Sequence, residues 1–254
     1  MGFYDLSKEN RIALVTKIDT EILNDFENNL LDNTIPYFSD EDTYIRKAGY
    51  LAIGKIFKLK KVSTAQIVTL LNNLFLFEKE KIRQTTINAA GEIGKIDFES
   101  VVHFFDKGLF DEHHSVRNAV IGSIKKMSEK NSKPVLSWAK KYLHHENKEI
   151  RREICHGIEL IGRTHPQDIL PLLKELQNDE TSRVKNTLIH VLGQIAYKKG
   201  CLETVIAELN TWNNKELVEK AIDEIVDVHH RYKDFAIHTQ EEAINYIINH
   251  YNQK

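Results

Sequence analysis

Three pairs of adjacent histidines are the residues most suggestive of metal chemistry, and they fall at 113–114, 144–145 and 229–230. A structural zinc site needs four converging ligands, usually at short spacings such as one helical turn. Adjacent histidines that lie on separate turns do not offer that arrangement. We therefore expect no metal site and no small-molecule cofactor.

The thiols Cys155 and Cys201 are the next candidates for chemistry. Cys155 falls in an otherwise apolar column of the repeat described below, which predicts a buried and unreactive thiol. The first ten residues do not resemble a signal peptide, so we expect a cytoplasmic location and reduced thiols. The sequence contains no glycine-rich phosphate loop and no serine nucleophile elbow.

Positive charge is concentrated in the middle of the chain. Residues 113–200 contain 16 lysines and arginines against 9 acidic residues, although the whole chain has a net charge of −2. Seven of the 12 histidines also lie in this window. Such a region is either a set of solvated helix faces or a surface that faces an anionic partner.

A repeated pattern explains how these residues are positioned. A β-branched or aliphatic residue followed by a long polar residue recurs with spacings of 37, 34, 34, 34 and 34 residues. A period of this length indicates a solenoid. The recurring pairs are Ile45-Arg46, Ile82-Arg83, Val116-Arg117, Ile150-Arg151, Val184-Lys185 and Val218-Glu219.

Each repeat reads as two helices joined by a polar turn. Apolar residues at positions 0, 4, 7, 8 and 11 from each anchor form one face of a second helix. The first helices are expected within residues 64–77, 98–110, 134–143, 167–176 and 202–209. Such a hairpin buries its apolar face only by stacking on a neighbour, so side-chain size is constrained while residue identity drifts.

The sequence therefore predicts an all-α fold, an α-solenoid of about six two-helix repeats with capping helices at both ends. Four prolines and 11 glycines in 254 residues also favour helices. We expect a single domain over residues 1–254, with an N-terminal cap at 1–23, repeats at 24–231 and a C-terminal cap at 232–254. No apolar run approaches the length of about 18 residues that spans a bilayer, so no membrane association is expected.

The motifs DEDTYIRKAGYLAIGKI and EKEKIRQTTINAAGEIGKI resemble the HEAT and HEAT-like repeat superfamily. The resemblance covers nearly the whole chain. It implies an α-solenoid whose first helices lie on the convex side and whose second helices line a concave face, and it implies no activity.

Residues on the second helices that turn away from the apolar stripe are the candidates for binding. The columns at +2, +6, +9 and +13 are polar and mostly basic, which suits phosphate oxygens or an acidic protein surface, with Tyr197 available to stack on a base. The candidate partner-binding residues are Lys58, Lys95, Lys125, Arg152, His156, Arg163, Asn186, His190, Gln194, Tyr197, Lys220 and Arg231. Of these, Arg152, Arg163, Lys125 and Arg231 are the strongest candidates for direct contact, and Arg152 and Arg163 should be exposed.

The arginine that follows each anchor has a different expected role. In this superfamily such an arginine commonly pairs with an acidic residue of a neighbouring turn. We expect a structural ladder for Arg46, Arg83, Arg117 and Arg151. Glycines at 54, 91 and 193 are expected to allow tight helix packing rather than close approach of a ligand.

Two enzyme families within the superfamily have functional residues that this sequence lacks at the matching positions. The HEAT-like hydroxylases hold two irons with His-Glu pairs at the start of second helices, and the matching positions here contain no such pair. Residues 138–212 are similar to the bacterial HEAT-like alkylpurine DNA glycosylases, which need an acid to stabilise a cationic sugar. The two portions of the chain that match the acidic positions read Cys155-His156-Gly157 and Gly193-Gln194-Ile195, so both acids are replaced; Glu92, Glu153 and Glu159 are the nearby acids.

The favoured interpretation is a non-enzymatic repeat protein whose basic concave face binds an anionic partner, with nucleic acid, notably DNA, ahead of an acidic protein surface. A DNA alkylation-repair glycosylase and a protein–protein interaction scaffold remain the alternatives. Trp138 is expected in the core, whereas Trp212, at the end of a first helix, is expected to be partly exposed.

Overall fold

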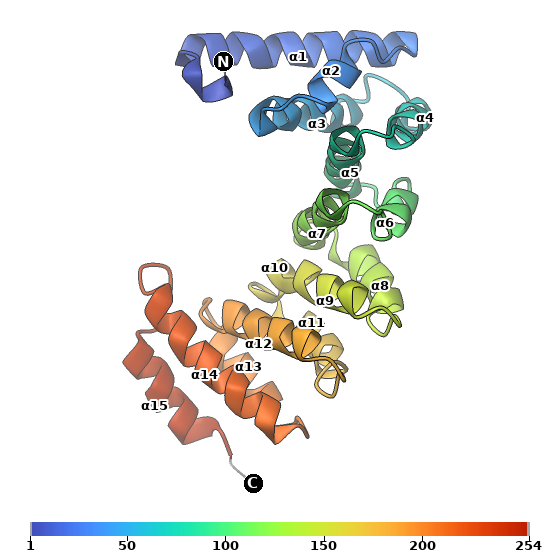
Figure 1. Ribbon diagram of the computed structural model, residues 1–254. Coiled ribbons are helices and arrows are strands. Elements are labelled where there is room, and N and C mark those ends of the chain that lie inside the picture. The colour runs from blue at the N-terminus through green and yellow to red at the C-terminus, as the bar shows by residue number, and fades with distance from the viewer. Residues whose placement is uncertain (1, 253–254) are drawn as a thin grey trace. The chain divides into compact units, whose positions relative to one another are not determined.

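The computed structural model describes residues 2–252, which form helices and turns and no strand (Figure 1). The all-α fold predicted from the sequence is therefore confirmed. The chain divides into two compact units, Met1–Asn131 (unit 1) and Ser132–Lys254 (unit 2). The single domain over residues 1–254 stays a prediction.

Unit 1 begins with a long helix, α1, which packs against α3 at the start of the array. The second helices α3, α5 and α7 pack side by side in chain order, while α2, α4 and α6 are the first helices of their repeats (Figure 1). The helices are α1 (Lys8–Asn28), α2 (Thr34–Phe38), α3 (Thr43–Lys58), α4 (Thr64–Phe75), α5 (Glu80–Gly94), α6 (Val102–Gly108) and α7 (His114–Ser128), preceded by a short 3-10 turn at Phe3–Asp5.

Unit 2 has the same two-layer construction. Its second helices α9, α12 and α14 form one layer, its first helices α11 and α13 pack against each other in the other layer, and α15 packs on both α13 and α14. The helices are α8 (Ser132–Tyr142), α9 (Lys148–Gly157), α10 (Glu159–Gly162), α11 (Pro166–Lys174), α12 (Ser182–Ala196), α13 (Cys201–Leu209), α14 (Lys215–Arg231) and α15 (Gln240–His250).

Polar residues in the turns start the second helices, as the repeat pattern predicts. The side chains of Asp42, Asn147 and Asn214 accept hydrogen bonds from the backbone N–H groups of Tyr44, Glu149 and Leu217. Each cap satisfies one N–H group that would otherwise lack a partner at the start of a helix. Each of the six predicted anchors lies near the start of a second helix, so the repeat pattern located these helices correctly.

One second helix is interrupted. The sequence predicts a continuous helix through residues 150–163, but α9 ends at Gly157 and α10 begins at Glu159, with Ile158 between them at φ −90° and ψ 3°. Gly157 has a weak helix propensity, and it immediately precedes this break. The interruption places Glu159 in the first turn of α10, beside His156.

The apolar stripe of the repeats forms the core of each unit. Trp138, Trp212, Phe104 and Phe105 are among the largest fully buried side chains. Trp138 was expected in the core and is 2% exposed, whereas Trp212 was expected to be partly exposed and is only 1% exposed. The side chain of Trp212 is covered because the residue still belongs to the first-helix layer, although α13 ends at Leu209.

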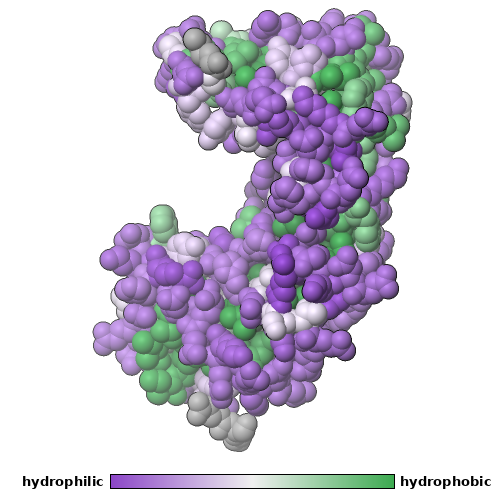
Figure 2. Space-filling view, viewed as in Figure 1, coloured by the Kyte–Doolittle hydropathy of each residue, from purple (hydrophilic) through white to green (hydrophobic). Residues whose placement is uncertain are grey.

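The surface of the protein is largely hydrophilic on the face shown in Figure 2. None of the helices within residues 2–252 is long and apolar enough to cross a membrane.

Candidate functional site

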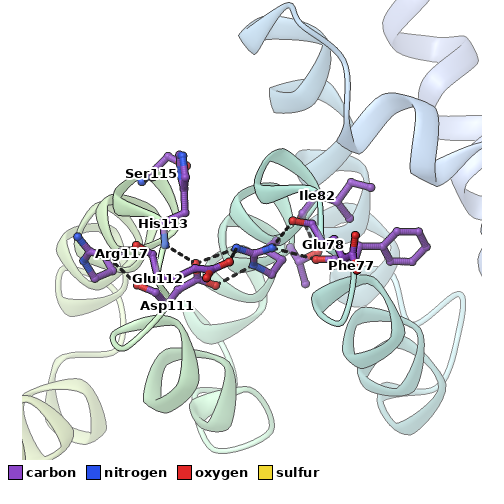
Figure 3. Close-up of polar contacts among 10 residues, drawn as sticks. Phe77, Glu78, Ile82, Asp111, Glu112, His113, Ser115 and Arg117 are labelled. Carbon is purple, nitrogen blue, oxygen red and sulfur yellow. Dashed lines mark hydrogen bonds and ion pairs between the residues drawn. The ribbon is translucent and has the colours of Figure 1, made fainter.

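In two repeats the arginine that follows the anchor pairs with an aspartate of the next repeat, and this arginine ladder holds successive repeats together. In unit 1, Arg83 donates from Nε and Nη2 to the two carboxylate oxygens of Asp111, over 2.8 and 3.0 Å (Figure 3). Its Nη1 also donates to the backbone carbonyl of Phe77. Asp111 in turn accepts from the backbone N–H of His113, so one carboxylate joins two successive repeats.

Unit 2 repeats this arrangement with Arg151 and Asp179. Arg151 donates to Asp179 over 2.6 and 3.1 Å and to the backbone carbonyl of His145. Burial opposes ionisation of Asp179, but hydrogen bonds from Arg151 and Thr181 outweigh it and hold the pKa of that carboxyl below its usual value.

The other two arginines, Arg46 and Arg117, have no aspartate at the matching position of the next repeat. Arg46 and Arg117 donate to carbonyl groups of their own turns, from Asp40 and Asp111 respectively. The residues that align with Asp111 and Asp179 in the following repeats are Phe77 and His145, which are not acids. The ladder predicted from the sequence is therefore confirmed for Arg83 and Arg151.

Two hollows lie between the second helices of unit 2. The first, which we call the α9–α12 hollow, has a volume of about 350 Å³. Four of its six lining residues are predicted partner-binding residues, namely Arg152, His156, Asn186 and His190, and Arg183 and Thr187 complete the lining.

The second, the α12–α14 hollow, is smaller, at about 170 Å³. It shares Asn186 with the first hollow and includes Lys220, both predicted from the sequence. Lys185 and Ser182 also line it, near the start of α12. The two hollows therefore form adjacent polar depressions across three consecutive second helices.

The basic side chains of these hollows are matched by acids. Arg152 contacts Glu149 over 3.0 Å and Glu153 over 3.5 Å, and Arg183 contacts Glu149 over 3.1 Å. The side chain of Arg152 is only 23% exposed, so the expectation that it is exposed was wrong. Arg183 is 63% exposed and is the more accessible guanidinium, although the repeat columns did not select it.

A buried carboxylate explains the position of Arg163. Glu159 is 2% exposed, and Arg163 is hydrogen-bonded both to Glu159 and to the side-chain oxygen of Gln194, the latter over 2.9 Å. The side chain of Arg163 is only 25% exposed. The expectation that Arg163 is exposed was therefore wrong, because its guanidinium is hydrogen-bonded to Glu159 and Gln194 within the unit.

Two further predicted binding residues are buried. Gln194 and Tyr197 are each 4% exposed. The ring of Tyr197 stacks on Tyr232 at 5.3 Å, and Arg163 and Lys198 lie over the same ring. Tyr197 is covered because the end of α14 packs against the end of α12, so it has no free face for a base.

The remaining predicted residues keep varied positions. His156 and His190 are partly exposed, and Lys58, Asn186, Lys220 and Arg231 are exposed. Lys95 and Lys125 in unit 1 are partly exposed. Lys95 forms an ion pair with Glu92, and Arg231 forms ion pairs with Glu224 and Asp227. Acidic side chains therefore lie beside these predicted basic residues.

Cys155 and the three glycines behave as expected. Cys155 is fully buried, and burial, with help from Glu159, raises the pKa of its thiol far above the usual value. A Cβ atom at Gly54, Gly91 or Gly193 would lie 2.6–2.8 Å from a side chain of the next second helix. These glycines therefore serve tight helix packing.

The sequence matches no protein-family model and no curated protein. Solved structures do match: AlkD2 from Streptococcus mutans has 16% identity and a TM-score of 0.55, covering 77% of this chain and 97% of that chain. The N-terminal domain of MAST/Orbit has 16% identity and a TM-score of 0.53, covering 78% and 97%. A TOG domain structure of Crescerin has 18% identity and a TM-score of 0.50, covering 80% and 88%. At these identities the likeness shows the fold, which is that of HEAT-like repeats.

Proposed function

We propose that this chain is a non-enzymatic HEAT-like repeat protein that binds an anionic partner, with nucleic acid favoured, through the second-helix layer of unit 2. The observation that carries the proposal is the pair of adjacent hollows, which present Arg152, Arg183, Lys185 and Lys220 from three consecutive helices. Asn186, which lines both hollows, adds a hydrogen-bond donor for phosphate oxygens.

The acids near these basic groups do not prevent such binding. Lys220 pairs with Glu216, whose side chain is 80% exposed, and Arg183 is itself 63% exposed. Exposed ion pairs contribute about 0–1 kcal/mol, so a phosphate can replace the carboxylate at little cost. Resemblance of residues 138–212 to the HEAT-like DNA glycosylases and the fold shared with AlkD2 support the same partner.

Placement of the acids favours binding without catalysis. Glu153 and Glu159 could in principle replace the missing glycosylase acids, but they are 4% and 2% exposed and contact Arg152 and Arg163. A carboxylate that is already neutralised by a guanidinium stabilises a developing cationic sugar poorly.

A protein partner is the second candidate. The alternation of acids and bases along the second helices, such as Glu149 between Arg152 and Arg183, would also match a protein surface of mixed charge. The fold is shared with TOG domains, and the Crescerin array is described as regulating microtubules.

Binding to labelled duplex, branched and single-stranded DNA at about 50 and 200 mM salt tests the proposal, because release of counterions weakens phosphate binding as salt rises. We expect salt-sensitive binding that falls at least about tenfold in the double variant Arg183→Glu with Lys220→Glu. The matched control reverses two exposed charges on α8, Lys133→Glu with Lys141→Glu, and should bind like the unaltered protein.

Equal binding by both double variants would refute the assignment to these hollows. An absence of DNA binding at either salt concentration would favour the protein partner. An alkylated duplex is included, and release of its modified base would refute the non-enzymatic function.

A further inference from the structure

Two histidines and a glutamate converge in unit 2, outside the ladder. His156 lies near the end of α9, Glu159 begins α10 and His190 lies in the middle of α12. One possible ligand atom from each residue lies within 4.8 Å of the other two. No adjacent histidine pair contributes to this cluster, which is why the sequence did not predict it.

The separation of the first two groups fits a shared ion. His156 Nε2 lies 3.2 Å from Glu159 Oε2. Two ligands of a tetrahedral zinc ion, each bonded at about 2.0–2.1 Å, lie about 3.3 Å apart. The two residues are three apart in the chain, a spacing that places their side chains on the same face of a helix, and the interruption at Ile158 lies between them.

Neighbouring groups hold the possible ligands in place. Arg163 forms an ion pair with Oε1 of Glu159, and Oε2 of the same carboxylate lies near Nε2 of His156. Glu224 Oε1 lies 3.6 Å from Nδ1 of His190, beyond hydrogen-bond distance, and accepts a hydrogen bond from Arg231. Carboxylates beside ligating histidines commonly orient the ring, and Glu224 is a carboxylate beside His190.

A fourth coordination position is accessible from solvent. His156 and His190 both line the α9–α12 hollow. Gln194 lies one helical turn after His190, is 4% exposed, and its side-chain nitrogen has no hydrogen-bond partner among the residues that the structure describes. Three protein ligands with one open position are typical of zinc sites that bind water or a substrate, rather than of closed structural sites.

We propose that His156, Glu159 and His190 bind one divalent transition-metal ion, with zinc the best match to two imidazoles and one carboxylate. The ion keeps a water molecule in the fourth position, facing the α9–α12 hollow. The rings of His156 and His190 also pack edge to face, with centroids 6.1 Å apart, so the three groups lie together before any ion binds, and one ion would contact all three. The guanidinium of Arg163 repels a cation, so the affinity is lower than that of a closed four-ligand site.

Metal binding can be tested without any partner, so its failure and the failure of the proposed function are distinguishable. Tag-free protein is treated with chelator, dialysed, and titrated with Co²⁺ by visible absorption and with Zn²⁺ by calorimetry. We expect one ion per chain, a Co²⁺ spectrum of tetrahedral type, and binding at least about tenfold weaker in His156→Gln and in His190→Gln.

The matched control is His144→Gln, because Nε2 of His144 also lies close to a glutamate, 2.7 Å from Glu175, outside the cluster. This variant should bind the ion like the unaltered protein. Far-UV circular dichroism checks that each variant is folded, and His190→Gln, which alters a 45% exposed side chain, decides the outcome if His156→Gln does not fold. Equal binding by the unaltered protein and His190→Gln, or no binding above that of scattered surface histidines, would overturn the proposal.

Discussion

Asp179 joins two successive repeats of unit 2 through its ion pair with Arg151. It pairs with Arg151 through two hydrogen bonds, and the side chains are 5% and 14% exposed. Replacing it by asparagine leaves a partly buried guanidinium without a counter-charge. We expect Asp179→Asn to lower the free energy of unfolding by about 2 kcal/mol at pH 7, measured by urea denaturation.

The same variant has a pH signature. The folded state holds the pKa of Asp179 below its usual value, so its stabilisation is present above the unfolded pKa of about 3.9 and is lost as pH falls through the folded pKa. The difference between the unaltered protein and Asp179→Asn should therefore shrink below about pH 4. Asp168→Asn, at an exposed position of α11, is the control. An undiminished difference at low pH would contradict the role of this ion pair.

At the residue scale, the repeat pattern located charged side chains but not their partners. It selected Arg152 and Arg163 as exposed contacts, and the structure shows both partly buried against Glu149, Glu153 and Glu159. Which acid neutralises a given base depends on the rotation of neighbouring helices, which a single repeat does not specify. Arg183, the accessible guanidinium, could have been noticed because it lies three residues before Asn186, on the same helix face as that selected residue.

Glycines within second helices offer a matched test at the element scale. A Cβ atom at Gly91 in α5 would lie 2.6 Å from Ser123 Oγ in α7, whereas a Cβ atom at Gly122 in α7 would meet nothing within 4 Å. We expect Gly91→Ala to destabilise unit 1 by about 1–3 kcal/mol, because the two helices must move apart. Gly122→Ala should stabilise it by about 0.5–1 kcal/mol, because alanine favours the helix. Chemical denaturation followed by circular dichroism measures both, and equal shifts would refute the packing argument.

The elements themselves were largely predictable. The 34-residue period located all six second helices, because burial of one face constrains residue size at fixed intervals. The break between α9 and α10 was not predictable from the period, since only Gly157 marks it. His156 and Glu159 lie about one helical turn apart, and the packing of α12 on α9 brings His190 to them, so the repeat pattern selected His156 and His190 singly and did not predict the cluster.

Side-chain exposure just beyond the ends of helices was not predictable from the repeat pattern. Tyr197 follows the last residue of α12 and was expected to offer a free ring, but it stacks on Tyr232 beyond α14. Trp212 follows α13 and was expected to be partly exposed, but it is 1% exposed. Helical periodicity no longer applies after a helix ends, so burial there depends on contacts between repeats.

At the scale of the whole molecule, the two tryptophans allow the compact units to be observed separately. Trp138 and Trp212 both lie in unit 2 and both are buried, so tryptophan fluorescence reports the unfolding of unit 2, whereas circular dichroism reports the helices of both units. In a repeat protein, stability is a sum of local terms, so a change in one repeat acts mainly near that repeat. We expect Gly91→Ala, in unit 1, to shift the urea transition seen by circular dichroism while leaving the fluorescence midpoint unchanged. Asp179→Asn, in unit 2, should shift the fluorescence midpoint and is the reciprocal control. If Gly91→Ala moves both transitions together, the chain unfolds as one cooperative domain over residues 1–254, as the sequence had suggested.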